Sequence, residues 1–250
     1  MANPIDSRTK IDFPFFIVLD GAMAVGSGFS RGQIQRTVVR GLDSLPYIPA
    51  STLKGRARDA AARLARTLGI YVCPGPNPKQ MCGAKGSLED ACLLCRTFGS
   101  PGVSSASGQT GLIWRDARIC DSQGQPITIT DSAESEAFYY AKTQVQLSRQ
   151  RATALEKHLF TTENTVENLR FKGRIRGWLL SARMMAGQYP AEIVLLLSAL
   201  KLLNFVGGGK SRGLGFCTVE LPDKITIGDQ DVDTTAILAN VSNLFNKEDR

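Results

Sequence analysis

The chain has one histidine in 250 residues, His158, which leaves little material for acid–base catalysis. A ribonuclease mechanism that uses a pair of imidazoles therefore cannot be assembled within one chain. A Cys–His or Ser–His nucleophile would need His158 itself, and no nucleophile motif accompanies it. We expect His158 to be an exposed residue of a basic segment.

The sequence also lacks a long hydrophobic run and a secretion signal. Its most apolar stretch, residues 193–203, is interrupted by Ser198 and Lys201 and is shorter than the roughly 20 residues that cross a bilayer. Residues 1–6 show no basic region followed by an apolar run. These absences predict a cytoplasmic protein with no membrane partner, whose six cysteines stay reduced and serve metal binding or packing.

Hydrophobic residues make up 43% of the chain, enough for a core, and basic residues outnumber acidic ones by 30 to 23. The basic excess is uneven. Residues 142–183 hold nine basic and three acidic residues, whereas residues 217–250 hold three basic and seven acidic ones. A basic body suggests an anionic partner, and nucleic acid is the most economical one. A basic protein that is merely soluble is the alternative.

Hydrophobic periodicity predicts an α+β fold with the element order strand, helix, strand, strand, helix, strand. The strands are expected at residues 15–22, 112–120, 169–179 and 215–221. The first helix is expected to begin near Ser51, which would cap it, and the second after Pro190. This order is that of a ferredoxin-like core, an open sheet with two helices on one face.

The third predicted strand carries the clearest pattern, because its apolar residues alternate with Arg170, Lys172, Arg174 and Arg176. A strand would sort the two kinds of side chain onto opposite faces, one apolar and one cationic. The chain adds insertions to this core at residues 70–110 and 121–168. Residues 222–250 form an acidic C-terminal segment.

Residues 207–215, which we call the glycine loop, read GGGKSRGLG, with five glycines in nine positions. The run is not a phosphate-binding P-loop, since that motif needs a glycine where the chain has Asn204 and a strand before it. A plain helix-to-strand turn needs one or two glycines. We therefore expect a loop whose backbone approaches a ligand closely, with Lys210 and Arg212 meeting phosphates.

Four cysteines gather in the first insertion: Cys73, Cys82, Cys92 and Cys95. The last two are separated by two residues, a spacing typical of metal ligands, and residues 74–78 (PGPNP) cannot form a core. We predict a structural zinc site of four thiolates, with four unliganded thiols as the alternative. Cys120 and Cys217 fall in predicted strands and are expected to be small core residues.

Three motifs of the chain occur in the same order in a known family: LPYIPASTLKG at residues 45–55, CLLCRTFGS at residues 92–100, and the glycine loop. Weaker matches are RDAR at residues 115–118 and KTQVQLSR at residues 142–149. On these motifs the chain resembles the RAMP superfamily from about residue 13 to residue 221. Within that superfamily it resembles the backbone subunit that repeats along the guide RNA in type III CRISPR effector complexes.

The resemblance implies a single RAMP domain over residues 1–250, with an RRM-like core, a zinc-bearing insertion and a β-hairpin thumb. We place the thumb within residues 148–162, where it would wedge into the guide–target duplex. The implied partners are guide RNA, complementary target RNA and neighbouring RAMP subunits. Guide RNA must be held independently of its sequence, so the contacts should go to phosphates and 2′-hydroxyls.

The RNA-binding residues expected on this basis are Arg36, Arg40, Ser51, Lys54, Arg56, Lys142, Arg149, Arg151, Gly207, Gly208, Gly209, Lys210, Ser211 and Arg212. Three of them, Lys142, Arg149 and Arg151, are expected at the base of the thumb.

The chain departs from the family at one position. Members that cut target RNA carry an aspartate in the loop after the first strand, and here that position falls on Gln35. Glutamine is neither a charged metal ligand nor a base, so we expect the subunit to hold RNA without cutting it. The alternative is an endoribonuclease that uses Mg²⁺ or Mn²⁺ with Asp43, the nearest loop acid.

Overall fold

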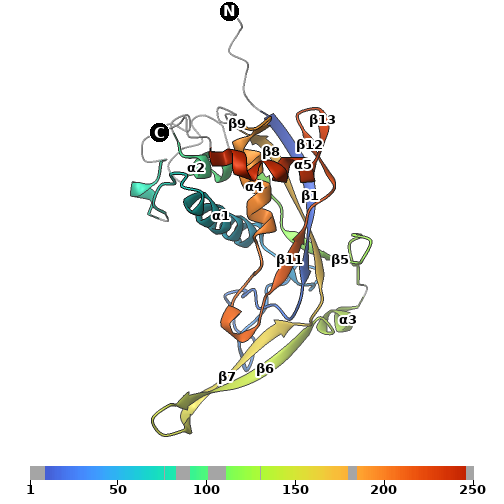
Figure 1. The fold of residues 1–250 in the computed structure, drawn as a ribbon. Coiled ribbons are helices and arrows are strands. Elements are labelled where there is room, and N and C mark those ends of the chain that lie inside the picture. Colours follow the sequence, from blue (N-terminus) through green and yellow to red (C-terminus); the bar gives the residue numbers. More distant parts are fainter. Residues whose placement is uncertain are drawn as a thin grey trace, which may run out of the picture.

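The computed structural model describes residues 9–75, 77–82, 91–100, 111–129, 131–179 and 185–245. Helices lie against an antiparallel sheet to form a body, and a long two-stranded hairpin projects from that body (Figure 1). The fold is α+β, as predicted. Within the described ranges, no helix is long and apolar enough to cross a membrane.

The sheet is built around two long central strands. β1 (Thr9–Leu19) pairs antiparallel with β8 (Arg170–Leu179) along nearly its whole length. The other edge of β8 pairs with β4 (Leu112–Trp114) and β5 (Ala117–Cys120), and β5 pairs with β3 (Tyr47–Ile48). β8 carries the predicted alternation, because Phe171, Ile175 and Leu179 are buried whereas Lys172, Arg174 and Arg176 are exposed on the opposite face.

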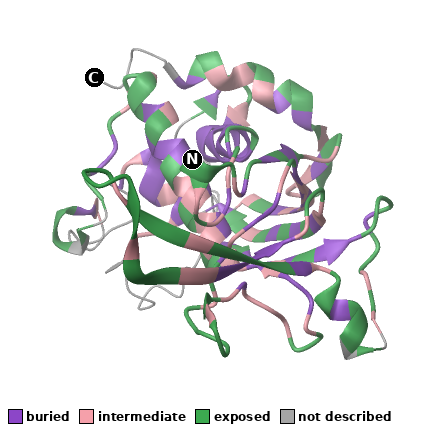
Figure 2. Ribbon diagram, turned by 90° about the horizontal axis from the view of Figure 1, so that it is seen from below, coloured by how far each residue is buried: buried purple, intermediate pink, exposed green. Residues whose placement is uncertain are grey.

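Three helices cover the inner face of the sheet. α1 (Ala50–Thr67) and α2 (Leu93–Phe98) both pack on α4 (Ala191–Lys201). Residues Ala191 to Leu200 of α4 are all buried, which Figure 2 shows as a central buried helix. Alternate residues of β1 face these helices and are at most 1% exposed: Ile11, Phe13, Phe15, Ile17 and Leu19.

The C-terminal part of the chain completes the body. β11 (Cys217–Glu220) and β12 (Lys224–Ile227) pair with the free edge of β1, and β13 (Gln230–Asp233) pairs with β12. α5 (Thr234–Leu238) and the 3-10 helix η5 (Ala239–Phe245) then lie against α4. The acidic C-terminal segment is therefore part of the folded body as far as residue 245.

The hairpin consists of β6 (Tyr139–Ser148) and β7 (Thr153–Thr165), with the short β2 (Ile34–Arg36) added parallel to β7. Its strands are exposed over most of their length (Figure 2). This hairpin is longer than the range of 148–162 expected for the thumb, since β6 pairs with β7 from Tyr139 onward and the turn spans residues 149–152. The remaining short elements are η1 (Pro78–Gln80), α3 (Ser132–Glu136), β9 (Met185–Ala186), β10 (Tyr189–Pro190) and η4 (Lys210–Arg212).

Local boundaries differ from the sequence prediction around Asp116. The strand expected at residues 112–120 is divided there into β4 and β5. Asp116 leaves the sheet and its Oδ1 accepts a hydrogen bond from the Ala50 N–H at 2.8 Å. Asp116 thus supplies the negative charge that a helix N-terminus favours, and Ser51, which lies inside α1, makes no capping hydrogen bond.

Candidate nucleic-acid interface

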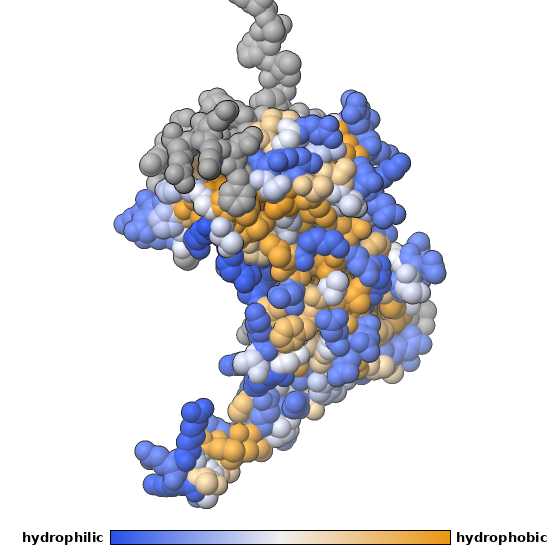
Figure 3. Space-filling model, in the orientation of Figure 1, coloured by the Kyte–Doolittle hydropathy of each residue, from blue (hydrophilic) through white to orange (hydrophobic). Residues whose placement is uncertain are grey.

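A cleft of about 460 Å³ lies where the hairpin joins the body. Four parts of the chain line it: the loop after β1, the first turns of α1, the glycine loop and the base of β7. Figure 3 shows the surface hollowed between the body and the hairpin. Predicted RNA-binding residues gather in this cleft: Arg36, Arg56, Gly207, Gly208, Gly209 and Arg212.

The glycine loop is held against the loop after β1 by backbone hydrogen bonds. The Gly208 N–H donates to the Ala24 carbonyl at 2.9 Å, and the Gly215 N–H donates to the Ala22 carbonyl at 2.8 Å. Gly207 has a φ of 79°, and a Cβ at this position would lie 2.8 Å from the Ala24 oxygen, so only glycine fits. Five amides of the loop, those of Gly208, Arg212, Gly213, Leu214 and Gly215, donate to carbonyls within the protein.

An aromatic ring supports two of these cations at the edge of the cleft. The Arg56 guanidinium lies 3.9 Å from the centroid of the Phe205 ring, and Lys210 Nζ lies 5.5 Å from the same centroid. Phe205 also lines an open depression with Lys210, Ser211 and Arg212. Phe205 therefore links helix α1 to the glycine loop in one cationic surface.

A chain of hydrogen bonds joins the glycine loop to the hairpin across the cleft. Arg212 Nη1 donates to Gln144 Oε1 at 2.8 Å, and Gln144 Nε2 donates to Thr162 Oγ1 at 3.0 Å. These contacts connect residues that the sequence separates widely. They set the position of the Arg212 side chain in the cleft.

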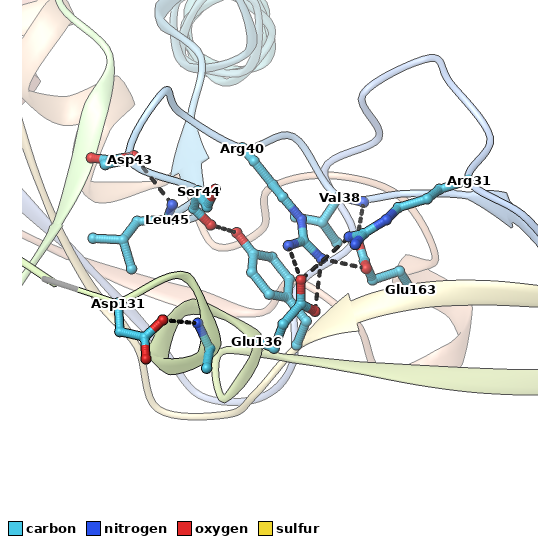
Figure 4. A network of polar contacts seen from close by, with 11 residues as sticks. Arg31, Val38, Arg40, Asp43, Ser44, Leu45, Asp131, Glu136 and Glu163 are labelled. Carbon is cyan, nitrogen blue, oxygen red and sulfur yellow. Dashed lines mark hydrogen bonds and ion pairs between the residues drawn. The ribbon is translucent and has the colours of Figure 1, made fainter.

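Arg40 holds the base of the hairpin to the loop after β1 (Figure 4). Its guanidinium donates to Glu163 Oε1 at 2.6 Å and to Glu136 Oε1 at 2.8 Å, and it lies 3.7 Å from the Tyr139 ring centroid. Arg31 reaches the same Glu136 oxygen at 3.3 Å. The hydrogen bond from Arg40 lowers the pKa of Glu136. Arg40 is therefore engaged within the protein and lies outside the set of cations that line the cleft.

Gln35 and Asp43, the two residues on which cleavage was argued, both make local contacts. Gln35 Oε1 accepts a hydrogen bond from the Thr161 N–H at 2.6 Å, which fastens β2 to β7. Asp43 lies in an exposed turn, where its Oδ1 accepts from the Leu45 N–H at 3.1 Å and its Oδ2 lies 3.8 Å from Arg118 Nη1. In the described part of the chain, Asp43 does not belong to a group of three or more His, Cys, Asp or Glu side chains that could hold a metal ion.

Five other predicted RNA contacts are not among the residues that line the cleft. Arg149 and Arg151 are in the exposed turn at the tip of the hairpin, not at its base, because the pairing of β6 with β7 continues to that turn. Lys142 is exposed on β6. On α1, Ser51 is exposed and Lys54 is half-buried, with its pKa lowered by that burial.

The cationic stripe of β8 is largely paired on the face of the sheet that the helices leave open. Arg174 binds both carboxylate oxygens of Asp12, at 2.7 and 2.8 Å, and this hydrogen bonding lowers the pKa of Asp12. Arg170 Nη2 donates to Glu220 Oε2 at 2.6 Å. Lys172 Nζ donates to the Gly124 carbonyl at 3.1 Å. Two of the four cations on this stripe, Arg170 and Arg174, are thus paired with acidic residues of the body.

The four cysteines of the first insertion come together as predicted, and we call them the cysteine cluster. The sulfur atoms of Cys73, Cys82, Cys92 and Cys95 all lie within 4.8 Å of one another. Four thiolates around a zinc ion at about 2.3 Å would lie about 3.8 Å apart, so the donor set fits a tetrahedral metal site. Cys120 and Cys217 are buried in β5 and β11, as expected.

Within the cysteine cluster, the pKa values of Cys92 and Cys95 shift in opposite directions. Hydrogen bonding with Cys95, together with burial, raises the pKa of the Cys92 thiol to about 12. The hydrogen bond from Cys92 lowers the pKa of Cys95, and Arg58 Nη2 lies 3.3 Å from the Cys95 sulfur. Arg58 Nη1 also donates to the Gly99 carbonyl at 2.6 Å. A cation of α1 therefore faces the thiol whose pKa is lowered.

A buried ion pair fixes the cysteine cluster to the core. Arg96, directly after Cys95, places its Nε 3.0 Å from Glu192 Oε1 in α4. The Glu192 side chain is 0% exposed and that of Arg96 is 8% exposed. Burial raises the pKa of Glu192, and Arg96 opposes that shift. The pair joins α2 to α4 at the centre of the molecule.

Sequence reasoning missed Phe205, Gln144 and Asn164, which support or line the cleft. Phe205 lies two residues before the glycine loop, and an aromatic residue close to a glycine-rich cationic loop is a signal that could have been used. Gln144 and Asn164 are polar residues of the hairpin strands. No local pattern distinguishes them from other polar residues there.

The sequence model of the RAMP superfamily matches residues 16–218, and the chain belongs to this superfamily. The family predicted from the three motifs is thereby confirmed. Among solved structures, the chain is similar to a chain of the Type III-B Cmr-beta cryo-EM structure of the apo state. The TM-score is 0.54 at 13% sequence identity, over 87% of this chain and 98% of that chain, so the likeness is one of fold. No curated protein matches the chain.

Proposed function

We propose that the chain is a guide-RNA-binding backbone subunit of a type III CRISPR ribonucleoprotein. The observation that carries this proposal is the cleft at the hairpin base, which gathers Arg36, Arg56 and Arg212 from three separate segments. Cations that converge on one groove suit contacts to the phosphates of a single RNA strand, which carry no sequence information. Membership of the RAMP superfamily and the likeness in fold to a chain of a type III-B complex support the same role.

The proposal includes a ferredoxin-like core. Strands β11, β1, β8 and β5 are hydrogen-bonded in that order, with α1 following β1 and α4 following β8 in the chain. This is the arrangement that the predicted element order requires. It leaves the hairpin and the glycine loop at the same end of the body, where they form the two sides of the cleft (Figure 1).

The hairpin is proposed to contact target RNA and a neighbouring subunit. Val145, Leu147 and Leu159 are exposed on it, by 43%, 62% and 66% of their surface. Val145 lies opposite Leu159 in the pairing of β6 with β7, so these side chains share a face. Apolar side chains on a projecting hairpin are typical of a contact surface.

We propose a holding role without cleavage of the target. The Gln35 side chain is paired with β7, and Asp43 stabilises a turn beside Arg118. A structural zinc ion in the cysteine cluster belongs to the proposal, since four sulfur donors select zinc among the common divalent ions. The four cysteines would hold the ion, which would order the segment around α2. We expect the protein to be cytoplasmic.

The test of RNA binding is the salt dependence of affinity for single-stranded RNA. Changing Lys210 and Arg212 to Ala should weaken binding for all sequences and reduce the slope of log affinity against log salt by roughly one to two units. The matched control changes Lys79 and Lys224 to Ala. Both are exposed cations outside the cleft, so the same loss of charge should leave the slope almost unchanged.

Equal slopes in the parent and in the Lys210 and Arg212 variant would remove the glycine loop from the interface. An equal loss in the control variant would mean that net charge, and no particular groove, attracts RNA. Salt-independent or absent RNA binding by the parent chain would contradict the proposed function itself.

A further inference from the structure

Asn164, in β7, is a buried polar side chain at the wall of the cleft. It is 1% exposed and lies among the residues that line the cleft. In the described part of the chain, neither Nδ2 nor Oδ1 of its amide has a hydrogen-bond partner. Buried polar atoms in folded proteins are nearly always paired, so an unpaired amide at a cleft wall indicates a group that a ligand completes.

The polar side chains next to Asn164 in β7 all make hydrogen bonds within the protein. Thr165 Oγ1 accepts the Met23 N–H at 3.0 Å. Glu163 accepts from the Val38 N–H at 2.9 Å as well as from Arg40. Thr162 Oγ1 accepts from Gln144 at 3.0 Å. The amide of Asn164 is therefore the exception in a stretch whose other polar groups are paired.

Strand geometry places this amide on the side of the hairpin that faces the glycine loop. Asn164 lies opposite Tyr140 in the pairing of β6 with β7, and side chains two residues apart share a face. Thr162 and Gln144 occupy that face, and Gln144 binds Arg212 of the glycine loop. The amide thus lies on the same side as the cations proposed to hold phosphates.

The chemistry of an amide selects among the parts of a nucleotide. A side-chain amide offers both a donor and an acceptor, whereas a phosphate oxygen only accepts. Phosphates in the cleft already have Arg36, Arg56 and Arg212. A ribose 2′-hydroxyl both donates and accepts, so it can satisfy Nδ2 and Oδ1 together, and it is the group that distinguishes RNA from DNA.

We propose that Asn164 binds the 2′-hydroxyl of a nucleotide in the cleft and thereby selects RNA over DNA. This inference rests on the proposed RNA-binding function and names the residue that sets its sugar specificity. A contact to the sugar keeps binding independent of the base sequence. The cations supply affinity for any single strand, and the amide supplies the preference for ribose.

The experiment compares the parent with Asn164→Leu on one single-stranded oligonucleotide of mixed sequence, made as RNA, as DNA and as 2′-O-methyl RNA. The parent should bind RNA most tightly. In the variant, affinity for RNA should fall about 5- to 10-fold, the worth of one or two net hydrogen bonds. Affinity for DNA should stay the same, so the ratio of RNA to DNA affinity should fall by the same factor.

The 2′-O-methyl RNA adds a second readout, because its oxygen can accept but has no proton to donate. The parent should bind it more weakly than RNA, and the variant should bind both alike. Arg212→Ala is the matched control, since loss of a phosphate contact lowers RNA and DNA affinity together and keeps their ratio. A thermal melt verifies folding, and Asn164→Ala gives the same comparison if the leucine variant does not fold.

An unchanged ratio of RNA to DNA affinity in a folded variant would overturn the inference and leave the amide as a buried structural group. Loss of affinity confined to strands that contain a particular base would also overturn it, because the amide would then read a base edge. In both cases the parent still binds RNA, so the proposed function stands. Failure of the parent to bind RNA would instead contradict the function.

Discussion

Arg40 and Glu163 form an ion pair of 2.6 Å whose side chains are 18% and 4% exposed. The pair lies between the loop after β1 and the base of β7, and Glu163 also accepts the Val38 N–H. A charged group taken out of water is tolerated only where its partner is present. The ion pair therefore helps to hold the base of the hairpin against the loop after β1.

Changing Glu163 to Gln should lower the free energy of unfolding by about 1–3 kcal/mol, since a charge-assisted hydrogen bond is lost while the amide oxygen can still accept from Val38. Denaturant unfolding measures this change. The matched control is Asp59→Asn, which breaks an exposed pair with Arg63 of 3.4 Å and should cost less than about 1 kcal/mol. Equal effects of the two changes would show that burial adds nothing to the Arg40 pair.

At the scale of an element, the cysteine-bearing segment has little apolar material of its own. Its buried cluster consists of Cys73, Met81, Ala91 and Cys95. Such a cluster removes little surface from water, so metal coordination is the stronger source of order there. The attachment of α2 to α4 through Arg96 and Glu192 joins this segment to the core.

Changing Cys92 and Cys95 to Ser should abolish bound zinc, because two of four ligands are lost, and should make the segment from Cys73 to Phe98 sensitive to protease. Metal content by elemental analysis and limited proteolysis measure the two effects. The sheet should remain folded. Cys217→Ala is the control, since this cysteine lies in β11 outside the cysteine cluster, and it should keep its zinc. Equal metal content in all three proteins would rule out the site.

At the scale of the whole molecule, the body needs its C-terminal residues. Ile225, Ile237 and Leu244 are at most 5% exposed and belong to the main core. Each buried aliphatic side chain contributes about 1.5–3 kcal/mol, and a whole domain is stable by only about 5–15 kcal/mol. Removal of this segment would therefore consume most of the stability of the fold.

A chain that ends at Leu221 should show no cooperative thermal transition in circular dichroism, because the face of α4 beneath α5 and η5 would be exposed. Changing Asp229 and Asp231 to Asn removes two negative charges from the C-terminal segment but keeps its buried side chains. Both residues are exposed, so this control should melt close to the parent. A truncated chain that melts like the parent would mean that residues 222–245 are dispensable for the body.

The sequence determined the features that depend on local pattern and residue type. The alternation of β8, the apolar helix α4, the glycine loop and the set of four cysteines follow from periodicity and chemistry within short stretches, and the structure contains each of them. The family followed from three motifs in order, and the family match confirms it.

Tertiary structure alone decided which of these residues meet. Asp116 binds the N-terminus of α1 from 66 residues away, and Arg40 pairs with Glu163 across 123 residues. The pairing register of the hairpin put Arg149 at its tip, and packing at its base left the amide of Asn164 buried and unpaired beside the cleft. Such contacts depend on which distant segments of the chain pack together, and a local pattern of residues carries no information about that packing.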